Sequence, residues 1–184
     1  MQWIIPGTVL TAQREDAIHI EANFSAMFLG GGIMLSQISA ISGLEPYDVQ
    51  NWVKRKLLPA PVQKRYDINQ LCRILTINML KKVLPMEQIC GLLTYINGDL
   101  DDQSDDIVDD SHLYFFFVRL AARARHIGGT ESWDDALSQV TADYHEPVPG
   151  AREKLIAVLR IMLTAWVAAQ LHENAERMIA QLNS

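Results

Sequence analysis

Several kinds of chemistry are excluded by what the sequence lacks. Only two of its 184 residues are cysteines, Cys72 and Cys90, and their spacing fits neither a redox motif nor a zinc motif. The five histidines are scattered, with no pair at positions i and i+4, so no metal site is expected. There is no G-x-S-x-G turn, Walker loop or glycine-rich dinucleotide turn. The sequence therefore predicts no enzyme and no cofactor, and two core thiols in a reducing compartment.

Targeting and membrane signals are also missing. The first residues carry no positive leader ahead of an apolar run, so no secretory signal is expected. The most apolar run, Leu155 to Ala169, is interrupted by Arg160 and falls short of the ~20 residues that a membrane span needs. We therefore expect a cytoplasmic protein in which this run is a buried helix.

Positive charge is scarce overall but concentrated in one segment. The chain has a net charge of −6, whereas residues 33–98 contain eight lysines and arginines against four acidic residues, a local charge of +4. A basic segment inside an acidic protein is typical of a surface that binds phosphates.

The same segment has the pattern of a helix-turn-helix. Apolar residues recur at helical spacing from Leu35, with Ser36 placed to cap the start. Gly43 can adopt the left-handed conformation that ends a helix, and Pro46 suits the first turn of the next one. In that second helix Val49, Trp52 and Val53 share one face. A short turn between two helices predicts a second helix that enters a DNA major groove.

Two further helices follow a crossing rich in proline. Pro59 and Pro61 prevent the helix from continuing, so residues 57–66 are expected to form at most a short two-stranded wing. Asp67 and Gln70 have the spacing of a capping box at the start of a helix that reaches about Leu84. Pro85 begins another helix, which ends at Gly98.

The chain around this segment divides into two further parts. Residues 1–32 predict an extended arm and a helix with Ile18, Ala22, Met27, Phe28 and Leu29 on its apolar side; the three glycines at 30–32 are expected to form a hinge. Residues 99–184 predict an acidic linker and a region of helices only. The fold class is therefore mainly α: an arm, a basic module at 33–98 and a C-terminal helical bundle.

The residues expected to contact DNA lie on the second helix, from Pro46 to Lys56, and on the wing, from Lys64 to Tyr66. Amide side chains can pair with adenine in the major groove, and cations bind the phosphate backbone. The candidates are Gln50, Asn51, Lys54, Arg55, Lys64, Arg65 and Tyr66. A solvated helix face and a charged turn are the alternative interpretations of these residues, whereas Trp52 is expected in the core.

The segment from Met34 to Leu93 resembles the DNA-binding module of mercury-resistance (MerR-type) regulators, in which a helix-turn-helix is followed by a wing and two helices. Ile89, Leu92 and Leu93 match the pattern that ends that module. The sequence differs at Gln50 and Lys64, where the type usually has arginine, and at Lys56, where it has glycine. Over most of its length the chain more closely resembles a bacterial family of uncharacterised proteins, through its QNWVKR core and its YING sequence with the aspartate-rich continuation.

The resemblance implies a MerR-like winged helix-turn-helix and a regulator that binds double-stranded DNA. In that interpretation the C-terminal helices pair two copies, so that two half-sites are met together. The alternative is a non-catalytic protein–protein interaction module on a winged-helix scaffold.

Two other features of residues 99–184 have open interpretations. Asp99, Asp101, Gln103 and Asp105 alternate as calcium ligands would, but Ser104 replaces the glycine of such a loop, so no calcium site is expected. The last aspartates are instead expected to cap the helix at Ser111. The aromatic block from Tyr114 to Phe117, with the helix that contains Trp166, could line a small-molecule effector pocket, although a core or a dimer seam is the commoner use.

Overall fold

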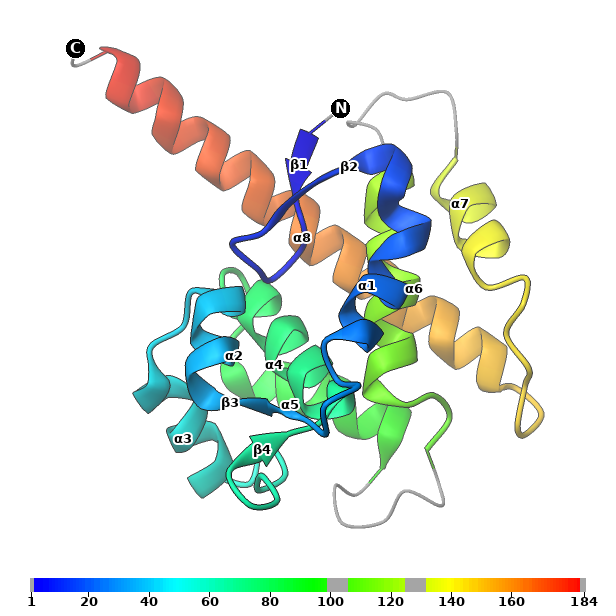
Figure 1. Ribbon diagram of the computed structural model, residues 1–184. Coiled ribbons are helices and arrows are strands. Elements are labelled where there is room, and N and C mark those ends of the chain that lie inside the picture. The colour runs from blue at the N-terminus through cyan, green and yellow to red at the C-terminus, as the bar shows by residue number, and fades with distance from the viewer. Residues whose placement is uncertain (1, 99–105, 125–131, 183–184) are drawn as a thin grey trace.

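The computed structural model describes residues 2–98, 106–124 and 132–182. These residues form a mainly helical protein with two small two-stranded sheets (Figure 1). In chain order the elements are β1 (Gln2–Ile4), β2 (Thr11–Gln13), the 3-10 helix η1 (Arg14–His19), α1 (Ile20–Ala26), β3 (Ile33–Met34), α2 (Leu35–Ser42), α3 (Pro46–Lys54), β4 (Arg65–Tyr66), α4 (Ile68–Leu80), α5 (Met86–Asn97), α6 (Asp110–Arg123), α7 (Trp133–Val140) and α8 (Ala151–Leu182).

The core is built around α4, α6 and α8. Helix α4 is buried on almost every side, and α6 packs along it. The aromatic block at the start of α6 is buried as well, and its rings meet others edge to face: Phe115 with Phe24 at 5.9 Å between ring centroids, and Phe117 with Trp166 at 6.4 Å. Of the interpretations open for the block from Tyr114 to Phe117, the core is therefore the one that the structure shows for these side chains. Helices from 33–98 and from 99–184 share this one cluster of buried residues.

The start of α4 confirms the capping box. The side chain of Asp67 accepts a hydrogen bond from the backbone N–H of Gln70 at 2.8 Å, and the side chain of Gln70 accepts one from the N–H of Asp67 at 2.8 Å. At α2 the cap differs from the one expected at Ser36. Gln37 Oε1 accepts from the N–H of Met34 at 2.9 Å, so the N-cap is Met34, two residues before Ser36, and the helix begins at Leu35.

The N-terminal helix has a different apolar face from the predicted one. Ala17, Ile20 and Phe24 are buried, whereas Ile18 and Leu29 are exposed. Residues 14–19 form a 3-10 helix with about three residues per turn, and this change of period shifts the inward face relative to an α-helix. The expected hinge at residues 30–32 is a turn that leads into β3, which pairs with β4.

Helix α8 is longer than the apolar run that indicated it. Its 32 residues exceed the ~20 needed for a membrane span, and by length and composition alone it could cross a membrane. Its first half, however, supplies the core with Leu155, Leu159, Met162 and Leu163, all fully buried. Core helices meet the same criterion of length and composition, and the burial accounts for part of the apolar sequence, since 39% of the apolar window of α8 is buried.

Candidate nucleic-acid interface

The turn between α2 and α3 is fixed by its backbone and by two side chains, those of Ser42 and Asn78. Gly43 has a φ of 71°, in the left-handed region, and its N–H donates to the carbonyl of Ser39 at 2.9 Å. The hydroxyl of Ser42 accepts from the N–H of Leu44 at 3.2 Å, and Asn78 Nδ2 donates to the carbonyl of Ser42 at 3.0 Å. Pro46 then starts α3, as its fixed φ allows. These hydrogen bonds, together with Pro46, set the orientation of α3 relative to α2.

The inner side of α3 is anchored in the core. Val49 and Trp52 are buried, and Lys81 Nζ lies 5.5 Å from the centroid of the Trp52 ring. The prediction that Trp52 is a core residue is confirmed. The helix is shorter than expected and ends at Lys54, because Lys56 adopts a φ of 56° and the chain turns there.

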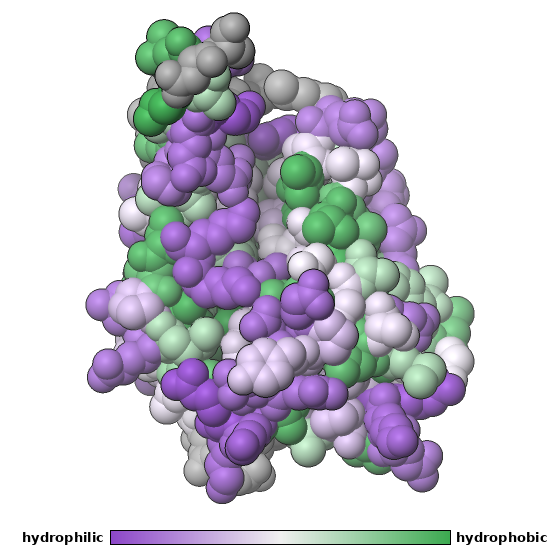
Figure 2. Space-filling view, turned by 90° about the vertical axis from the view of Figure 1, so that its left-hand side faces the viewer, coloured by the Kyte–Doolittle hydropathy of each residue, from purple (hydrophilic) through white to green (hydrophobic). Residues whose placement is uncertain are grey.

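The outer side of α3 is polar and open to solvent. Gln50, Lys54 and Arg55 are exposed, and Asn51 is half-buried. Tyr47 belongs to the same face, at 73% exposure, because positions 47, 50, 51 and 54 have the i, i+3, i+4, i+7 spacing of one helix side. That spacing was available in the sequence, but Tyr47 was not among the predicted contacts. Figure 2 shows that the lower part of this side of the molecule, over α2 and α3, is largely hydrophilic.

The wing is a tight turn beside this helix. Val62 and Arg65 exchange backbone hydrogen bonds of 3.1 and 2.9 Å, and the two residues between them, Gln63 and Lys64, have φ values of 50° and 63°. Positive φ at both central positions is the geometry of a type I′ hairpin turn. Lys64 therefore lies exposed at the tip. Figure 1 shows this turn, before β4, at the same end of the molecule as α3.

The two residues after the tip have different environments. Arg65 is exposed, and its guanidinium donates to the carbonyl of Gly32 at 2.9 Å, which ties the wing to the residue directly before β3. Tyr66 is only 3% exposed, and burial raises the pKa of its phenol. Of the seven predicted contacts, the structure thus leaves Tyr66 in the core, while the other six lie at or near the surface of α3 and the wing. Tyr66 pairs with Ile33, a partner far away in the sequence.

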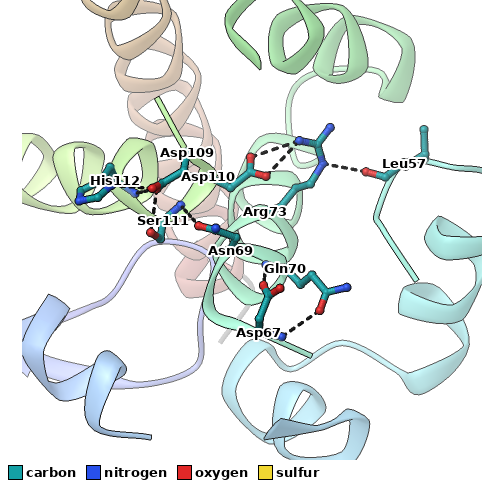
Figure 3. A network of polar contacts seen from close by, with 9 residues as sticks. All are labelled: Leu57, Asp67, Asn69, Gln70, Arg73, Asp109, Asp110, Ser111 and His112. Atoms are coloured by element: carbon teal, nitrogen blue, oxygen red, sulfur yellow. Dashed lines mark hydrogen bonds and ion pairs between the residues drawn. The ribbon is translucent and has the colours of Figure 1, made fainter. Parts of the chain in front are cut away.

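A polar network joins this interface to the C-terminal helices (Figure 3). Arg73 Nε donates to the carbonyl of Leu57 at 2.9 Å, in the segment between α3 and the wing, and Arg73 Nη1 lies 3.2 Å from Asp110 at the start of α6. Gln70 Nε2 donates to the carbonyls of Pro59 and Ala60 at 3.0 and 3.1 Å. Helix α4 therefore holds both the segment that leads to the wing and the first turn of α6.

The acids of this network have opposite pKa shifts. Burial raises the pKa of Asp110, although the positive charge of Arg73 opposes the shift. Burial would also raise the pKa of Asp109, but hydrogen bonds from the backbone and ring of His112 and from Ser111 outweigh it and lower that pKa. Asp109 accepts from the N–H of His112 at 2.7 Å. The prediction that the last aspartates precede and cap this helix is confirmed.

The remaining candidates for metal binding are the aspartate-rich segment, the histidines and the cysteines. Asp99, Asp101, Gln103 and Asp105 lie outside the described residues. Within 2–98, 106–124 and 132–182, no group of three or more histidine, cysteine or acidic side chains could hold a metal ion. Both cysteines are free thiols. Burial, with the charge of Asp110, raises the pKa of Cys72 well above its usual value, which disfavours the thiolate form.

The structure thus defines a mainly helical protein with a helix pair and a short turn exposed at one end. Residues 34–117 match the sequence model of a family described as a domain of unknown function, DUF1836. This match begins at β3, continues through the α2–α3 pair and α4, and ends within α6, so it includes both Arg73 and Asp110.

A curated protein matches part of the same chain. An uncharacterised protein of Bacillus subtilis (strain 168), YkrK, is 29% identical over 86 residues, which are 45% of this chain and 37% of YkrK. No solved structure matches. The similarity to a family of uncharacterised bacterial proteins is thus found again, whereas a MerR-type module is not among the matches.

Proposed function

We propose that the protein is a cytoplasmic transcriptional regulator that binds double-stranded DNA through a MerR-like winged helix-turn-helix. Helix α3 would enter the major groove, and the turn at Lys64 would contact the backbone. One observation carries the proposal: α3 is anchored by Val49 and Trp52 and presents a solvent-facing side of amide and cationic side chains. Amides and cations are the groups that read bases and neutralise phosphates.

Local conformation supports the comparison with the MerR type. Lys56 has a positive φ at the position where that type usually has glycine, the residue that adopts such a conformation without strain. The chain therefore follows the backbone path that a glycine would permit. MerR-type regulators usually have arginine at position 50, where this chain has glutamine. The proposed role of Gln50 is therefore base reading and not phosphate binding.

The cations exposed on α3 and the wing set the expected salt dependence of DNA binding. Lys54, Arg55, Lys64 and Arg65 are exposed. If each neutralises one phosphate, log affinity falls with log salt at a slope of about −4 for one copy and about −7 for two copies, by the ~0.9 per contact typical of duplex DNA. Tyr66 is left out of the proposed contacts because it is buried.

The test begins with selection of bound sequences from a random duplex pool, because the target is unknown. Affinity for a selected duplex is then measured by fluorescence anisotropy between about 50 and 200 mM salt, the range over which phosphate contacts are lost. The variant Lys54→Gln/Arg55→Gln/Lys64→Gln should bind at least about 100-fold more weakly and with a smaller slope. A matched control, Arg123→Gln/Arg160→Gln/Arg177→Gln, removes three exposed cations from α6 and α8 and should bind as the natural protein does. Equal loss in both variants, or no enriched sequence, would reject the proposal.

A protein-interaction module is the second candidate, and one observation favours it. Tyr47 and Val62 are 73% and 76% exposed at the same end of the molecule, and exposed aromatic residues are common at protein interfaces. In that case, Tyr47→Ala should remove capture of a protein partner, while the three-cation variant should still capture it. DNA binding predicts that the three-cation variant loses more affinity than Tyr47→Ala.

A further inference from the structure

The C-terminal part of α8 leaves the body of the protein. The last residue of this helix that is buried is Ala169, and from Gln170 to Leu182 every residue is exposed except the half-buried Glu173. At 1.5 Å per residue this free end is about 20 Å long. Figure 1 shows α8 running beyond the other helices at its C-terminal end.

This free end has an apolar side that nothing in the described structure covers. Leu171, Met178 and Leu182 are 54%, 59% and 86% exposed. Figure 2 shows apolar side chains gathered at this end, at the top of the view. A helix that served only as a solvated extension would carry polar residues on all sides.

These residues belong to one regular stripe along α8, which we name the 4-3 stripe. Its members alternate in steps of four and three residues, and all of them are exposed: Ala157, Ile161, Thr164, Ala168, Leu171, Ala175, Met178 and Leu182. Such spacing, sustained over more than three heptads, is that of a coiled-coil seam. The core residues of α8, such as Leu155, Met162 and Ala169, lie on the other side of the helix.

From residue 165 onward, the flanks of the 4-3 stripe carry no formal charge, while Arg160, which flanks Ile161, pairs with Asp134 of α7. The positions on either side of it from 165 onward are Ala165, Val167, His172, Asn174, Ile179 and Gln181. The charged residues of the free end, Glu173, Glu176 and Arg177, lie outside the seam, and Glu173 pairs with Lys82 at 2.5 Å. A partner that matches this surface is therefore apolar and uncharged, as a second copy of the same stripe is.

The body of the protein offers a groove where the 4-3 stripe begins. It has a volume of about 460 Å³ and lies between α5 and α8. Leu84, Leu92 and Tyr95 line it from the side of α5, and Ala157 and Ile161, the first two members of the stripe, line it from α8. One copy thus carries an apolar groove at one end of the stripe and free apolar side chains at the other.

We propose that two copies pair antiparallel along the 4-3 stripe, with the free end of each α8 filling the α5–α8 groove of the other. A two-fold axis between residues 171 and 172 places Leu182 near Ile161, Met178 near Thr164, and Ala175 near Ala168. Two alanines then face each other near the axis, and the most exposed apolar side chain of the free end, Leu182, reaches the groove.

This arrangement covers the 4-3 stripe and the α5–α8 groove of both copies. An isologous pair closes on itself, so neither groove is left for a third copy. A parallel pair would place Leu182 against Leu182 and leave both grooves empty. The seam from Ile161 to Leu182 is about 33 Å long, and with the α5 residues of the groove it approaches the ~20 residues per side of a standard interface.

Sedimentation of the full chain tests the pairing without DNA, so its outcome is separate from that of the proposed function. The natural protein should be a dimer at about 100 μM, far above the Kd of a stable pair. Leu171→Glu/Met178→Glu should weaken the dimer by about 100-fold or more, because each copy would bring two charges into an apolar seam. The control Ala180→Glu adds a charge to the same free end outside the seam and should leave the dimer unchanged. Thermal melting followed by circular dichroism checks that each variant is folded.

Variants at the groove and at the seam test the register. Tyr95→Glu lies on α5, outside the free end, and should also weaken the dimer. In a Cys90→Ser background, Leu171→Cys should form a disulfide between copies and Leu182→Cys should not, since only a parallel pair brings two copies of residue 182 together. A monomer at 100 μM, a dimer that persists in the double variant, or a disulfide at residue 182 would each overturn the proposal. So would binding of the monomeric chain to phosphatidylglycerol vesicles through this stripe, which would make the partner a membrane surface.

Discussion

Arg73 on α4 and Asp110 at the first turn of α6 form a buried ion pair, with their side chains only 7% and 15% exposed. One guanidinium nitrogen lies 3.2 Å from both carboxylate oxygens, and Nε donates to the carbonyl of Leu57. A single arginine therefore joins three segments: the chain after α3, the central helix and the start of the aromatic helix. A displacement of α6 would therefore move Arg73, and with it the loop at Leu57 that leads to the wing.

Removing the acid from this pair should be costly. In Asp110→Ala the Arg73 guanidinium stays buried without its counter-charge, and loss of one partner of a buried pair costs about 3–5 kcal/mol. The double variant Arg73→Met/Asp110→Leu leaves no unpaired charge and should lose less than Asp110→Ala alone. Urea unfolding followed by circular dichroism gives both free energies. A loss below about 1 kcal/mol in Asp110→Ala would mean that water already screens the pair.

The turn between α2 and α3 depends on glycine at one position. Gly43 has a φ of 71°, and an added Cβ would lie 2.7 Å from Cγ1 of Val9. Gly43→Ala should lower the free energy of unfolding by about 1–2 kcal/mol through the left-handed conformation. The added variant Val9→Ala removes the contact and should recover only a part. As a control, Gly91→Ala meets no atom within 4 Å and should stabilise α5 by about 0.5–1 kcal/mol.

Lys56 has a positive φ although it is not a glycine, which is the reverse of the case at Gly43. Its φ of 56° places a residue with a Cβ in the left-handed region, so Lys56→Gly should raise the free energy of unfolding by up to about 1 kcal/mol. Lys56→Ala removes the same charge but keeps the Cβ, and it should bring no such gain. If both variants change stability equally, the effect comes from the charge and not from the backbone.

The starts and ends of several helices could be predicted from the local sequence. The Asp67–Gln70 capping box, the left-handed Gly43 and the start of α3 at Pro46 each depend on neighbours within a few residues, and all three are confirmed. These features could be predicted because their hydrogen bonds and steric limits are visible in a short window.

Pairings between distant segments could not be predicted in this way. Tyr66 looked like a wing contact because it follows Lys64 and Arg65, but its pairing with Ile33 turns it into the core. Ile18 and Leu29 were assigned to an apolar helix face, yet both are exposed. Ile18 lies in the 3-10 helix at residues 14–19, and Leu29 lies in the turn that follows the end of α1 at Ala26. The pairing of Arg73 with Asp110 joins residues on two helices, and neither sequence neighbourhood indicates the other.

The proposed DNA contacts divide into base reading and phosphate binding, and single variants should separate them. Gln50→Ala removes an amide from the outer side of α3 and should change which sequences are enriched from a random pool, with little effect on the salt slope. Lys64→Gln removes the cation at the tip of the wing turn and should weaken binding to all sequences, with a slope smaller by about 1 per copy. Selection followed by salt titration measures both. If Gln50→Ala leaves the enriched sequence unchanged, this amide does not read a base.

Asp109 should give the protein part of its acid sensitivity. Its pKa is lowered in the folded state by hydrogen bonds from His112 and Ser111, so the unfolded chain binds the proton more readily. The stabilisation is therefore complete above the unfolded pKa of about 4 and is lost as the pH falls through the folded pKa. Asp109→Asn keeps a capping oxygen but not the charge, so it should be less stable than the natural protein at pH 7, and the difference should shrink below about pH 4.

Urea unfolding at pH 7, 5, 4 and 3 measures this difference. Asp143→Asn, which removes a carboxylate from an exposed position after α7, serves as the control for the loss of one charge. A difference at Asp109 that is constant across this range would show that the neutral cap, rather than the ionised carboxylate, stabilises α6. A difference that shrinks equally in both variants would point to the net charge of the chain and not to the helix cap.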